Sequence, residues 1–316
     1  LRYILAVAKV LSKLPGAVLF TGNRMVVWWL MLVYAMFGAA WLISRRRKVR
    51  YWIPAACSVL ALCAVLTVNA VQLQRTSTVT ALDVSQGQSI MFSSGRACAV
   101  VDCGGRSTAE DPGDLAARKL LAQGHRSLDL LVLTHPHDDH VNGVLRLMHW
   151  LPVRTLVIPA AADTTQAPLS DILALAEANH TAVVRVDAER TVTAGGISVH
   201  LYPEPCAGQE DGSMIVLTSI GDYDTLVPGD VDTTAEVKFI SNCTYPSVEL
   251  LLVGHHGSKK STCDAWLDAI APDAAIISVG YNSYGHPTSE TLERLQAHNI
   301  PIYRTDQMGD ITVHLS

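Results

Sequence analysis

The sequence predicts an α/β protein, in which a helical membrane segment precedes a layered α/β sandwich. Two observations support this prediction. No Asp or Glu occurs before Asp83, and long apolar runs fill much of that acid-free part. From Thr78 onward, short β-rich runs alternate with helical patterns, and Gly, Asp and Pro separate them. Such alternation favours a layered α/β architecture over an all-β domain. We therefore place one domain over residues 1–75 and a second over residues 76–316.

Two apolar stretches in the first domain have the length of membrane spans. Residues 25–43 form an unbroken apolar run, about as long as a helix needs to cross a hydrocarbon layer of about 30 Å. The second stretch covers residues 51–73. A cleaved signal peptide would show one short apolar region instead of two full spans. The turn between them, residues 45–50, reads Arg-Arg-Arg-Lys-Val-Arg, and short basic loops of this kind stay in the cytoplasm. We expect a multi-pass protein of the cell membrane, with the second domain on the outer, periplasmic or extracellular, side.

The second domain is expected to contain short strands that alternate with helices along the chain. Turns at Gly87, Gly95 and Gly104 separate three early strands, and each later strand or helix follows from its hydrophobic period. The expected strands are residues 79–83, 89–93, 98–102, 128–133, 183–186, 197–202, 214–220, 224–227, 249–253 and 274–279, with two more near Ile302 and Ile311. The expected helices are residues 114–122, 141–150, 169–179, 263–270 and 289–298.

A cluster of metal-binding residue types follows the expected strand at residues 128–133. Residues 134–140 read Thr-His-Pro-His-Asp-Asp-His. Imidazoles and carboxylates suit zinc or manganese, and the spacing offers one ligand pair, His135 with His137, and a second, Asp139 with His140. A solvated turn or a single structural zinc site are the alternatives. Because four ligand types lie together at a strand end, we favour two divalent metal ions, Mn or Zn.

Two later segments offer further ligands. Asp230 ends a β-rich segment in Val-Pro-Gly-Asp, where a carboxylate is able to bridge two ions, although Gly-Asp is also a common turn pair. His255 and His256 follow the apolar residues 250–253. Adjacent side chains that leave a strand diverge, so one of the two histidines should face the ions. The sequence leaves open which one, with a preference for His256.

These segments together resemble the metallo-β-lactamase superfamily, and in particular the terminal hydrolase domain of the ComEC/Rec2 family, the DNA-uptake channel proteins of natural competence. The resemblance covers about residue 79 to the end. Its motifs are residues 82–88 (Leu-Asp-Val-Ser-Gln-Gly-Gln), 134–140, 227–230, 254–258 (Gly-His-His-Gly-Ser) and 278–287 (Ser-Val-Gly-Tyr-Asn-Ser-Tyr-Gly-His-Pro). The chain departs from the family pattern in two places. Ser85 and Gln88 replace a Gly and an Asp in the first motif, and Asp211-Gly212-Ser213 replaces a middle motif in which an Asn precedes the Ser.

The resemblance implies a metallo-β-lactamase-like αββα sandwich for residues 76–316. It also implies a binuclear metal-dependent phosphodiesterase or nuclease that degrades the non-imported DNA strand, with Asp139, Asp230 and His286 as catalytic residues. Single-stranded DNA, held transiently, and other DNA-uptake proteins would be the partners. The chain would be a fragment, and residues 1–75 would be the last spans of a channel.

The same resemblance implies the residues of the substrate side. Ser258 and Lys259 supply phosphate-binding groups, and Asn282 and Ser213 are the other candidates. His286 is suited to donate a proton to the leaving oxygen, because a histidine pKa lies near neutrality. Many superfamily members have a third histidine for the first metal, and none of the candidates by number fits the pattern convincingly: His149, His180 and His200.

The charge of the second domain favours a different substrate. It contains 14 Lys and Arg against 29 Asp and Glu, a formal charge of −15. Proteins that bind DNA normally neutralise phosphates with Lys and Arg. A hydrolase of a small or cell-surface phosphodiester is therefore one alternative. A non-catalytic extracellular domain of the channel is another, although the intact ligand set argues against it.

Overall fold

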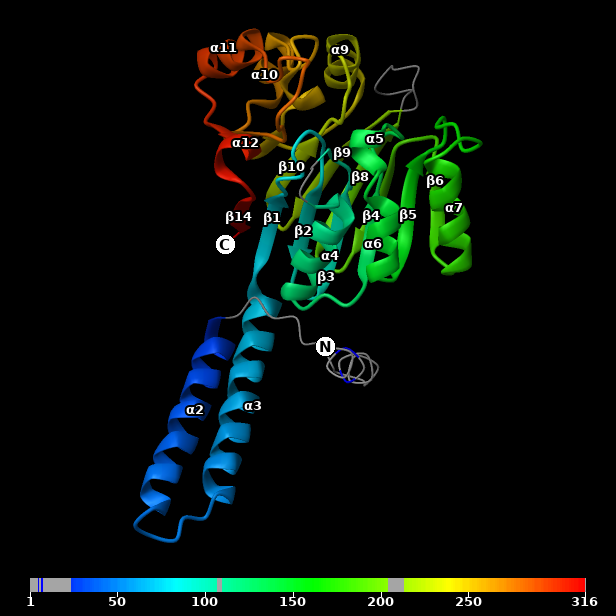
Figure 1. Cartoon of the computed structure of the whole chain (residues 1–316). Coiled ribbons are helices and arrows are strands. Elements are labelled where there is room, and N and C mark those ends of the chain that lie inside the picture. Colours follow the sequence, from blue (N-terminus) through cyan, green and yellow to red (C-terminus); the bar gives the residue numbers. More distant parts are fainter. Residues whose placement is uncertain (1–4, 6, 8–23, 107–109, 204–212, 316) are drawn as a thin grey trace. The chain divides into compact units, whose positions relative to one another are not determined.

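The computed structural model describes residues 5, 7, 24–106, 110–203 and 213–315 (Figure 1). The chain divides into two compact units, and each is described by itself. One unit comprises Leu1–Leu73 with Arg118–Gly124, and the other comprises Gln74–Ala117 with His125–Ser316. The domain boundary expected at residue 75 stays a prediction.

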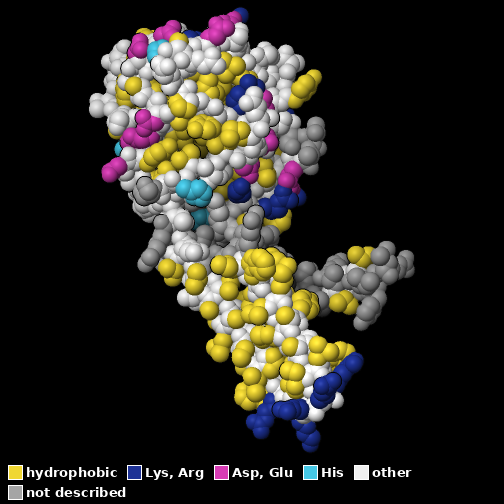
Figure 2. Space-filling view, turned by 90° about the vertical axis from the view of Figure 1, so that its left-hand side faces the viewer, with side chains coloured by type: hydrophobic (Ala, Val, Ile, Leu, Met, Phe, Trp, Pro, Cys, Tyr) yellow, Lys and Arg dark blue, Asp and Glu magenta, His cyan; other side chains and the backbone are white. Residues whose placement is uncertain are grey.

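Two helices side by side, α2 (Arg24–Ser44) and α3 (Trp52–Arg75), form most of the first unit. Trp29 Nε1 of α2 donates a hydrogen bond to the carbonyl of Ser58 in α3 at 2.9 Å. Figure 2 shows apolar side chains along both helices and Lys and Arg side chains at the turn between them. An apolar helical surface left open in this way is suited to lipid.

The lengths of the two apolar stretches differ. The stretch Met25–Ser44 of α2 is long and apolar enough to cross a membrane, whereas the apolar stretch of α3, Trp52–Val68, is shorter. One candidate span is therefore established by length and composition. The second span, and the outer location of the second domain, stay predictions.

Two seven-stranded sheets form the centre of the second unit in the described part of the chain. The first sheet has the order β14 (Ile311–Leu315), β1 (Ser77–Ala81), β2 (Ile90–Ser94), β3 (Ala97–Val101), β4 (Leu128–Val132), β5 (Val153–Pro159) and β6 (Ala182–Val186). The second sheet has the order β13 (Ile302–Arg304), β12 (Ala274–Ile277), β11 (Leu250–Leu252), β10 (Tyr223–Val227), β9 (Met214–Ile220), β8 (Ile197–Pro203) and β7 (Arg190–Ala194).

The sheets pack face to face because alternate side chains of both are apolar. Val79 and Ala81 of β1 belong to the same buried cluster as Val199 and Leu201 of β8, at the spacing of two that one strand face requires. A second apolar cluster lies between the outer face of the second sheet and three helices: α9 (Thr233–Asn242), α10 (Asp264–Ile270) and α11 (Ser289–Ala297). The helices contribute Phe239, Trp266 and Leu295 to it.

Helices also cover the first sheet, where α6 (Val144–Trp150) and α7 (Leu169–Ala178) lie on the outer face in Figure 1. The expected αββα sandwich is thereby confirmed. The remaining helices are α4 (Pro112–Ala122), α5 (Asp138–Val141) and α12 (Thr305–Met308), with a short 3-10 turn at Gly254–Gly257.

The helix expected over residues 141–150 is wrong in one respect, since the structure has α5 and α6 separated at Asn142 and Gly143. The amide of Asn142 exchanges two hydrogen bonds with the backbone of Gly105, at 3.0 and 2.8 Å. A Cβ on Gly143 would lie 2.6 Å from the backbone nitrogen of Gly113. Contacts with a distant loop therefore break the helix where the local pattern continues it.

Candidate metal centre

The candidate site forms where strands of both sheets end. In the first sheet, β4 leads into the loop that carries His135 and then into α5, which carries His140. In the second sheet, β10 leads to Asp230 and β11 leads to the turn with His255 and His256. Strands β10, β11 and β12 are parallel neighbours, so their carboxyl ends lie at one edge. The polar residues of separate motifs are brought together for this reason.

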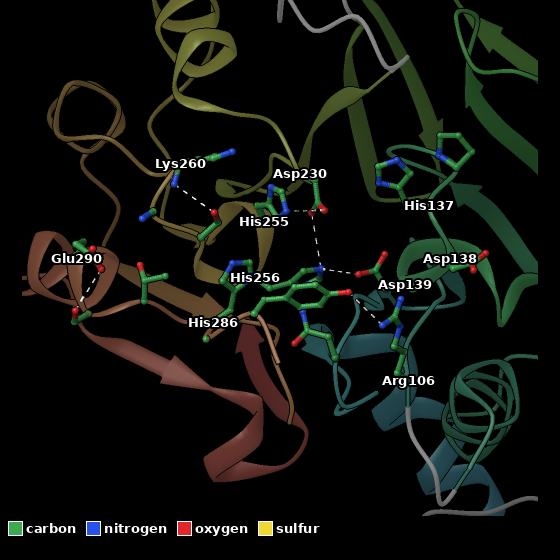
Figure 3. Close-up of a pocket in the computed structure, with 18 of the residues that line it drawn as sticks. Arg106, His137, Asp138, Asp139, Asp230, His255, His256, Lys260, His286 and Glu290 are labelled. Atoms are coloured by element: carbon green, nitrogen blue, oxygen red, sulfur yellow. Dashed lines mark hydrogen bonds and ion pairs between the residues drawn. The ribbon is translucent and has the colours of Figure 1, made fainter. Parts of the chain in front are cut away.

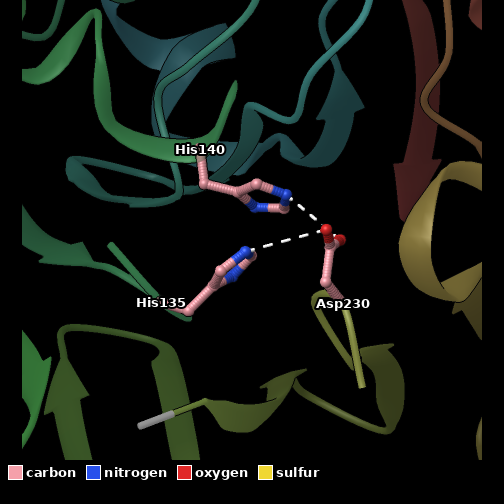
Figure 4. A group of neighbouring side chains, drawn as sticks. All are labelled: His135, His140 and Asp230. Carbon is pink, nitrogen blue, oxygen red and sulfur yellow. Dashed lines mark ion pairs between the residues drawn. The ribbon is translucent and has the colours of Figure 1, made fainter. Parts of the chain in front are cut away.

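His135, His140 and Asp230 make the first group of potential ligands (Figure 4). His140 Nε2 lies 3.2 Å from Asp230 Oδ1, and His135 Nε2 lies 3.7 Å from Asp230 Oδ2. The two imidazole rings have centroids 4.1 Å apart. Two ring nitrogens thus face one carboxylate, an arrangement that suits a divalent cation.

Asp139, His140 and His256 make the second group. His256 Nε2 lies 3.6 Å from Asp139 Oδ2 and 3.8 Å from Asp230 Oδ1. In each group the potential ligand atoms all lie within 4.8 Å of one another. Asp230 is close to members of both groups, which is the position expected for a bridging carboxylate.

Several of these atoms are buried without the partners that buried polar atoms need. In the described part of the chain, Nε2 of His135, His140 and His256 and Oδ1 of Asp230 have no hydrogen-bond partner. A buried polar atom left unpaired costs about 1–3 kcal/mol. Four such atoms that face one another fit a site built for metal ions, and divalent metal binding is what this ligand set supports.

Asp102 orients His140 and was not recognised from the sequence. Its carboxylate is fully buried and lies 2.8 Å from Nδ1 of His140. It also accepts hydrogen bonds from the backbone nitrogen and the hydroxyl of Thr134, both at 2.7 Å, and from Nε2 of Gln88 at 2.8 Å. A carboxylate behind a ligating histidine fixes its ring and its tautomer. The sequence signal was an Asp at the end of a β-rich run, before Gly104.

The structure separates the roles of the two adjacent histidines. Both have left-handed backbone angles, with φ of 50° for His255 and 53° for His256. His256 is buried, and its Nδ1 lies 2.8 Å from the carbonyl of Ser278, so its Nε2 faces the site. Nε2 of His255 also lies near the site, 3.7 Å from Asp230 Oδ2, but its side chain is 40% exposed and its ring is 5.7 Å from that of His286. The geometry supports His256 over His255 as a ligand.

The charges in the site oppose the effect of burial. Burial lowers the pKa of His140, but the carboxylates of Asp230 and Asp102 outweigh it and hold that pKa well above its usual value. Burial raises the pKa of Asp230, and the nearby imidazoles of His140 and His256 outweigh it, so the net shift is strongly downward. Burial and the neighbouring His140 lower the pKa of His135. The centre favours ionised carboxylates, as a cation site requires.

A pocket of about 990 Å³ opens over these residues (Figure 3). Among the residues predicted for the site, those in its wall are His137, Asp139, Asp230, His255, His256, Ser258, Lys259 and His286. The wall also contains Lys260, which the sequence places beside Ser258 and Lys259 as a phosphate-binding group, and two residues to which sequence reasoning gave no role: Arg106 and Tyr284. Arg106 reaches Tyr284, whose hydroxyl is 3.4 Å from Nη1 of the guanidinium. Basic groups therefore flank the potential ligands.

Three predicted residues lie differently from the rest. His137 is exposed, and its ring centroid is 4.5 Å from that of His135, but it belongs to neither ligand group. Asn282 is outside the pocket wall, and its amide holds the backbone of its own loop. Ser213 is buried, directly before Met214, whose nitrogen donates to the carbonyl of Thr134 at 2.8 Å. Asn282 thus holds its own loop in place, and Ser213 lies in the segment that pairs with Thr134, so neither faces the pocket directly.

The candidates for a third histidine lie outside both ligand groups, as far as the structure describes the chain. His149 Nδ1 is 2.6 Å from the carbonyl of Leu145 within α6, and His200 Nδ1 is 2.9 Å from the hydroxyl of Thr191 in β7. His180 follows α7 in a left-handed conformation. The segment around Asp211 and Gly212 lies outside the described residues.

An αββα sandwich with clustered His and Asp at its strand ends defines a class of metal-binding proteins, and the chain belongs to the metallo-β-lactamase superfamily, whose family model matches residues 82–281. Within that class, the curated relatives include competence proteins, and the ComEC/Rec2 resemblance is confirmed. ComE operon protein 3 of Bacillus subtilis (strain 168) is 28% identical over 249 residues, which are 73% of this chain and 32% of that protein. Competence protein ComA of Neisseria gonorrhoeae is 29% identical over 238 residues, 73% of this chain and 31% of that protein. The chain thus spans about a third of the length of these relatives.

Solved structures with the same fold differ widely in sequence. YhfI from Bacillus subtilis has a TM-score of 0.52 at 13% identity, covering 76% of this chain and 100% of that one. Zn(2+)-bound PqqB from Methylobacterium extorquens has a TM-score of 0.51 at 15% identity, covering 75% of this chain and 100% of that one. These likenesses show the fold alone. Family membership and the ligand set together support a metal-dependent hydrolase.

Proposed function

We propose that the second unit is a binuclear metal-dependent phosphodiesterase that cleaves DNA, and that it degrades the non-imported strand during DNA uptake. The observation that carries the proposal is that two potential ligand groups share His140, with Asp230 near His256 of the second group, in a pocket lined by basic side chains. The competence relatives support the assignment to DNA uptake. A membrane location, the outer face and association with other DNA-uptake proteins belong to the same proposal.

The geometry offers His135, His140 and Asp230 for one ion and Asp139, His140 and His256 for the other, with Asp230 close to both groups. The pairing expected from the sequence would add His137 beside His135, and His255 is a further candidate because its Nε2 lies 3.7 Å from Asp230 Oδ2. Two divalent cations, Mn or Zn, would supply positive charge that offsets the developing charge on a phosphate and lowers the pKa of water. His255 and His137, which are more exposed, are the weaker members of this set.

The remaining residues act on the substrate directly. Ser258, Lys259 and Lys260 lie on one wall of the pocket and are placed to contact phosphate oxygens. Asp139 and Asp230 are placed to accept a proton from an attacking water. His286 lines the same pocket, and burial lowers its pKa, with His255 and His256 adding to the effect. A neutral His286, with Nδ1 buried and unpaired in the described structure, is suited to orient the leaving oxygen through a hydrogen bond. To protonate that oxygen, the ring would first have to take up a proton, which its lowered pKa opposes.

Hydrolysis of a small or cell-surface phosphodiester is the second candidate function, and the formal charge of −15 over residues 76–316 favours it. The two candidates share the metal centre and differ only in what enters the pocket. A third possibility, a non-catalytic domain of a channel, predicts no hydrolysis of either substrate.

The test uses the whole chain in detergent micelles with Mn²⁺ or Zn²⁺. Labelled linear DNA and a chromogenic phosphodiester are supplied in parallel, and Asp139→Ala is compared with Asp138→Ala. Asp138 is a matched control because it is exposed, adjacent in sequence and absent from both ligand groups. We expect Asp139→Ala to lose at least about 100-fold in rate on both substrates, and Asp138→Ala to retain most activity. Cleavage of the ester alone would transfer the assignment to the second candidate, and cleavage of neither would refute the hydrolase.

A further inference from the structure

The loop between β12 and α11 presents two tyrosine rings to solvent beside the candidate metal centre. Tyr281 is 97% exposed and Tyr284 is 60% exposed. Tyr284 lines the pocket, and its ring centroid is 5.9 Å from that of His286. Large aromatic side chains usually bury most of their surface. Tyr284 in the pocket wall and Tyr281, three residues earlier on the same loop, are therefore candidates for contact with a ligand.

The loop that carries these rings is held rigidly from within by Asn282. The side-chain nitrogen of Asn282 donates to the carbonyls of Gly280 and His286, at 2.9 and 2.8 Å. Its side-chain oxygen accepts from the nitrogens of Tyr284 and His286, at 3.1 and 3.0 Å. All four hydrogen-bonding positions of the amide are thereby used on the loop backbone. A surface that is ordered before it binds loses less entropy on binding, so the hydrogen bonds of Asn282 preorganise the loop backbone that carries the rings.

Basic side chains lie on both sides of the metal centre, next to these rings. Figure 3 shows Arg106 and Lys260 on opposite sides of the pocket, with Asp230 and Asp139 between them. Lys259 also lines the pocket, and the hydroxyl of Tyr284 is 3.4 Å from the guanidinium of Arg106. The pocket rim thus combines positive charge with aromatic surface, although the domain as a whole is acidic.

We propose that Tyr281 and Tyr284 form a stacking platform for the unpaired bases of a single-stranded nucleic acid, whose phosphates contact Arg106, Lys259 and Lys260. This inference rests on the proposed phosphodiesterase function and names its substrate class. Bases stack on exposed aromatic rings without regard to sequence, and each contact has a large effect on affinity. In a duplex the bases stack on one another and are not available to the rings. The platform therefore selects a single strand, or an unpaired end, over intact duplex.

The first test measures binding without turnover. The whole chain in detergent micelles, with EDTA present, is titrated against a fluorescent oligothymidylate and an abasic oligonucleotide of the same length. We expect Tyr281→Ala and Tyr284→Ala each to weaken binding of the oligothymidylate by about tenfold, and Tyr281→Trp to retain it. The wild type should bind the abasic strand about as weakly as the double Ala variant binds the oligothymidylate. Because both side chains are exposed, unchanged melting temperatures will show that the variants fold.

A second measurement separates this inference from the function on which it rests. Hydrolysis of methyl p-nitrophenyl phosphate by the wild-type chain with Mn²⁺ reports on the metal centre and requires no base stacking. If the protein hydrolyses the ester but binds abasic and base-containing strands equally, the stacking platform is refuted while the phosphodiesterase function is not. A preference for bases without hydrolysis of the ester would support the platform and overturn the phosphodiesterase.

Discussion

The carboxylate of Asp102 lies 2.8 Å from Nδ1 of His140 and so directs Nε2 of that ring towards Asp230, 3.2 Å away. The two residues are 38 positions apart, and their contact joins the end of β3 to the loop after β4. Because His140 belongs to both ligand groups, the orientation of this single ring affects both.

Asp102→Asn tests the effect of that contact on metal affinity. Asn tolerates the left-handed φ of 58° at this position, so the fold is expected to persist. Its amide nitrogen would face Nδ1 of His140 and favour the tautomer with the proton on Nε2, which cannot bind a cation. We expect metal affinity to fall by about 10- to 100-fold, measured by competition with a chromogenic chelator. Asp129→Asn is the control, since Asp129 pairs with Arg154 away from the site. An equal loss in both variants would argue for a general effect on folding.

The number of bound metal ions distinguishes which of His255 and His256 is a ligand. His256 is buried against the carbonyl of Ser278, whereas His255 is 40% exposed. We expect His256→Ala to reduce bound metal from two ions to one, measured by mass spectrometry of the digested protein after dialysis. His255→Ala should retain both ions and should raise KM more than it lowers kcat. The reverse pattern would assign the ligand to His255.

The salt dependence of binding follows from the three basic residues at the pocket. Each phosphate neutralised on a single strand contributes about −0.7 to the slope of log K against log salt concentration, so three contacts predict a slope of about −2. Lys259→Ala should make that slope shallower by about 0.7. Both slopes are obtained by fluorescence anisotropy from about 50 to 300 mM salt. A slope steeper than about −4 would show that further cations of the domain contribute.

A pH-dependent stability is expected from Glu236, a fully buried residue of α9. Its carboxylate accepts a hydrogen bond from the nitrogen of Cys263 at 2.9 Å, yet burial outweighs this and raises its pKa above 4.5. Between the ordinary and the raised pKa, the folded chain holds a proton that the unfolded chain has lost. The free energy of unfolding therefore falls as pH rises through this window.

Glu236→Gln does not titrate, so it removes this contribution. We expect the stability advantage of the wild type over the variant to shrink as pH rises from about 4 to about 7. Midpoints of thermal unfolding in detergent, taken across that range, give the comparison. An advantage that grows with pH would mean that Glu236 is stabilised as a carboxylate, against its expected pKa direction.

Most strands could be predicted because their burial gives a regular apolar pattern, as in Met214–Ile220, where the expected and observed bounds agree. Strand β7 was missed because it is an edge strand whose side chains are mostly outside the core, so it has no continuous apolar run. Helix α9 was missed because Phe239 is among the few of its residues that reach the apolar cluster. Elements with such weak local patterns are stabilised by tertiary contacts instead.

The sequence by itself determined the chemistry of the candidate site. Imidazoles and carboxylates in residues 134–140, Asp230 and the pair His255 and His256 follow apolar runs, and residue type and strand period are local properties. Only the tertiary structure decided which atoms face one another. Asp102 and Arg106 reach the site through contacts between segments far apart in the chain, and backbone angles at His256 turn one ring inward. Orientation of this kind depends on hydrogen bonds across two sheets, which no local pattern contains.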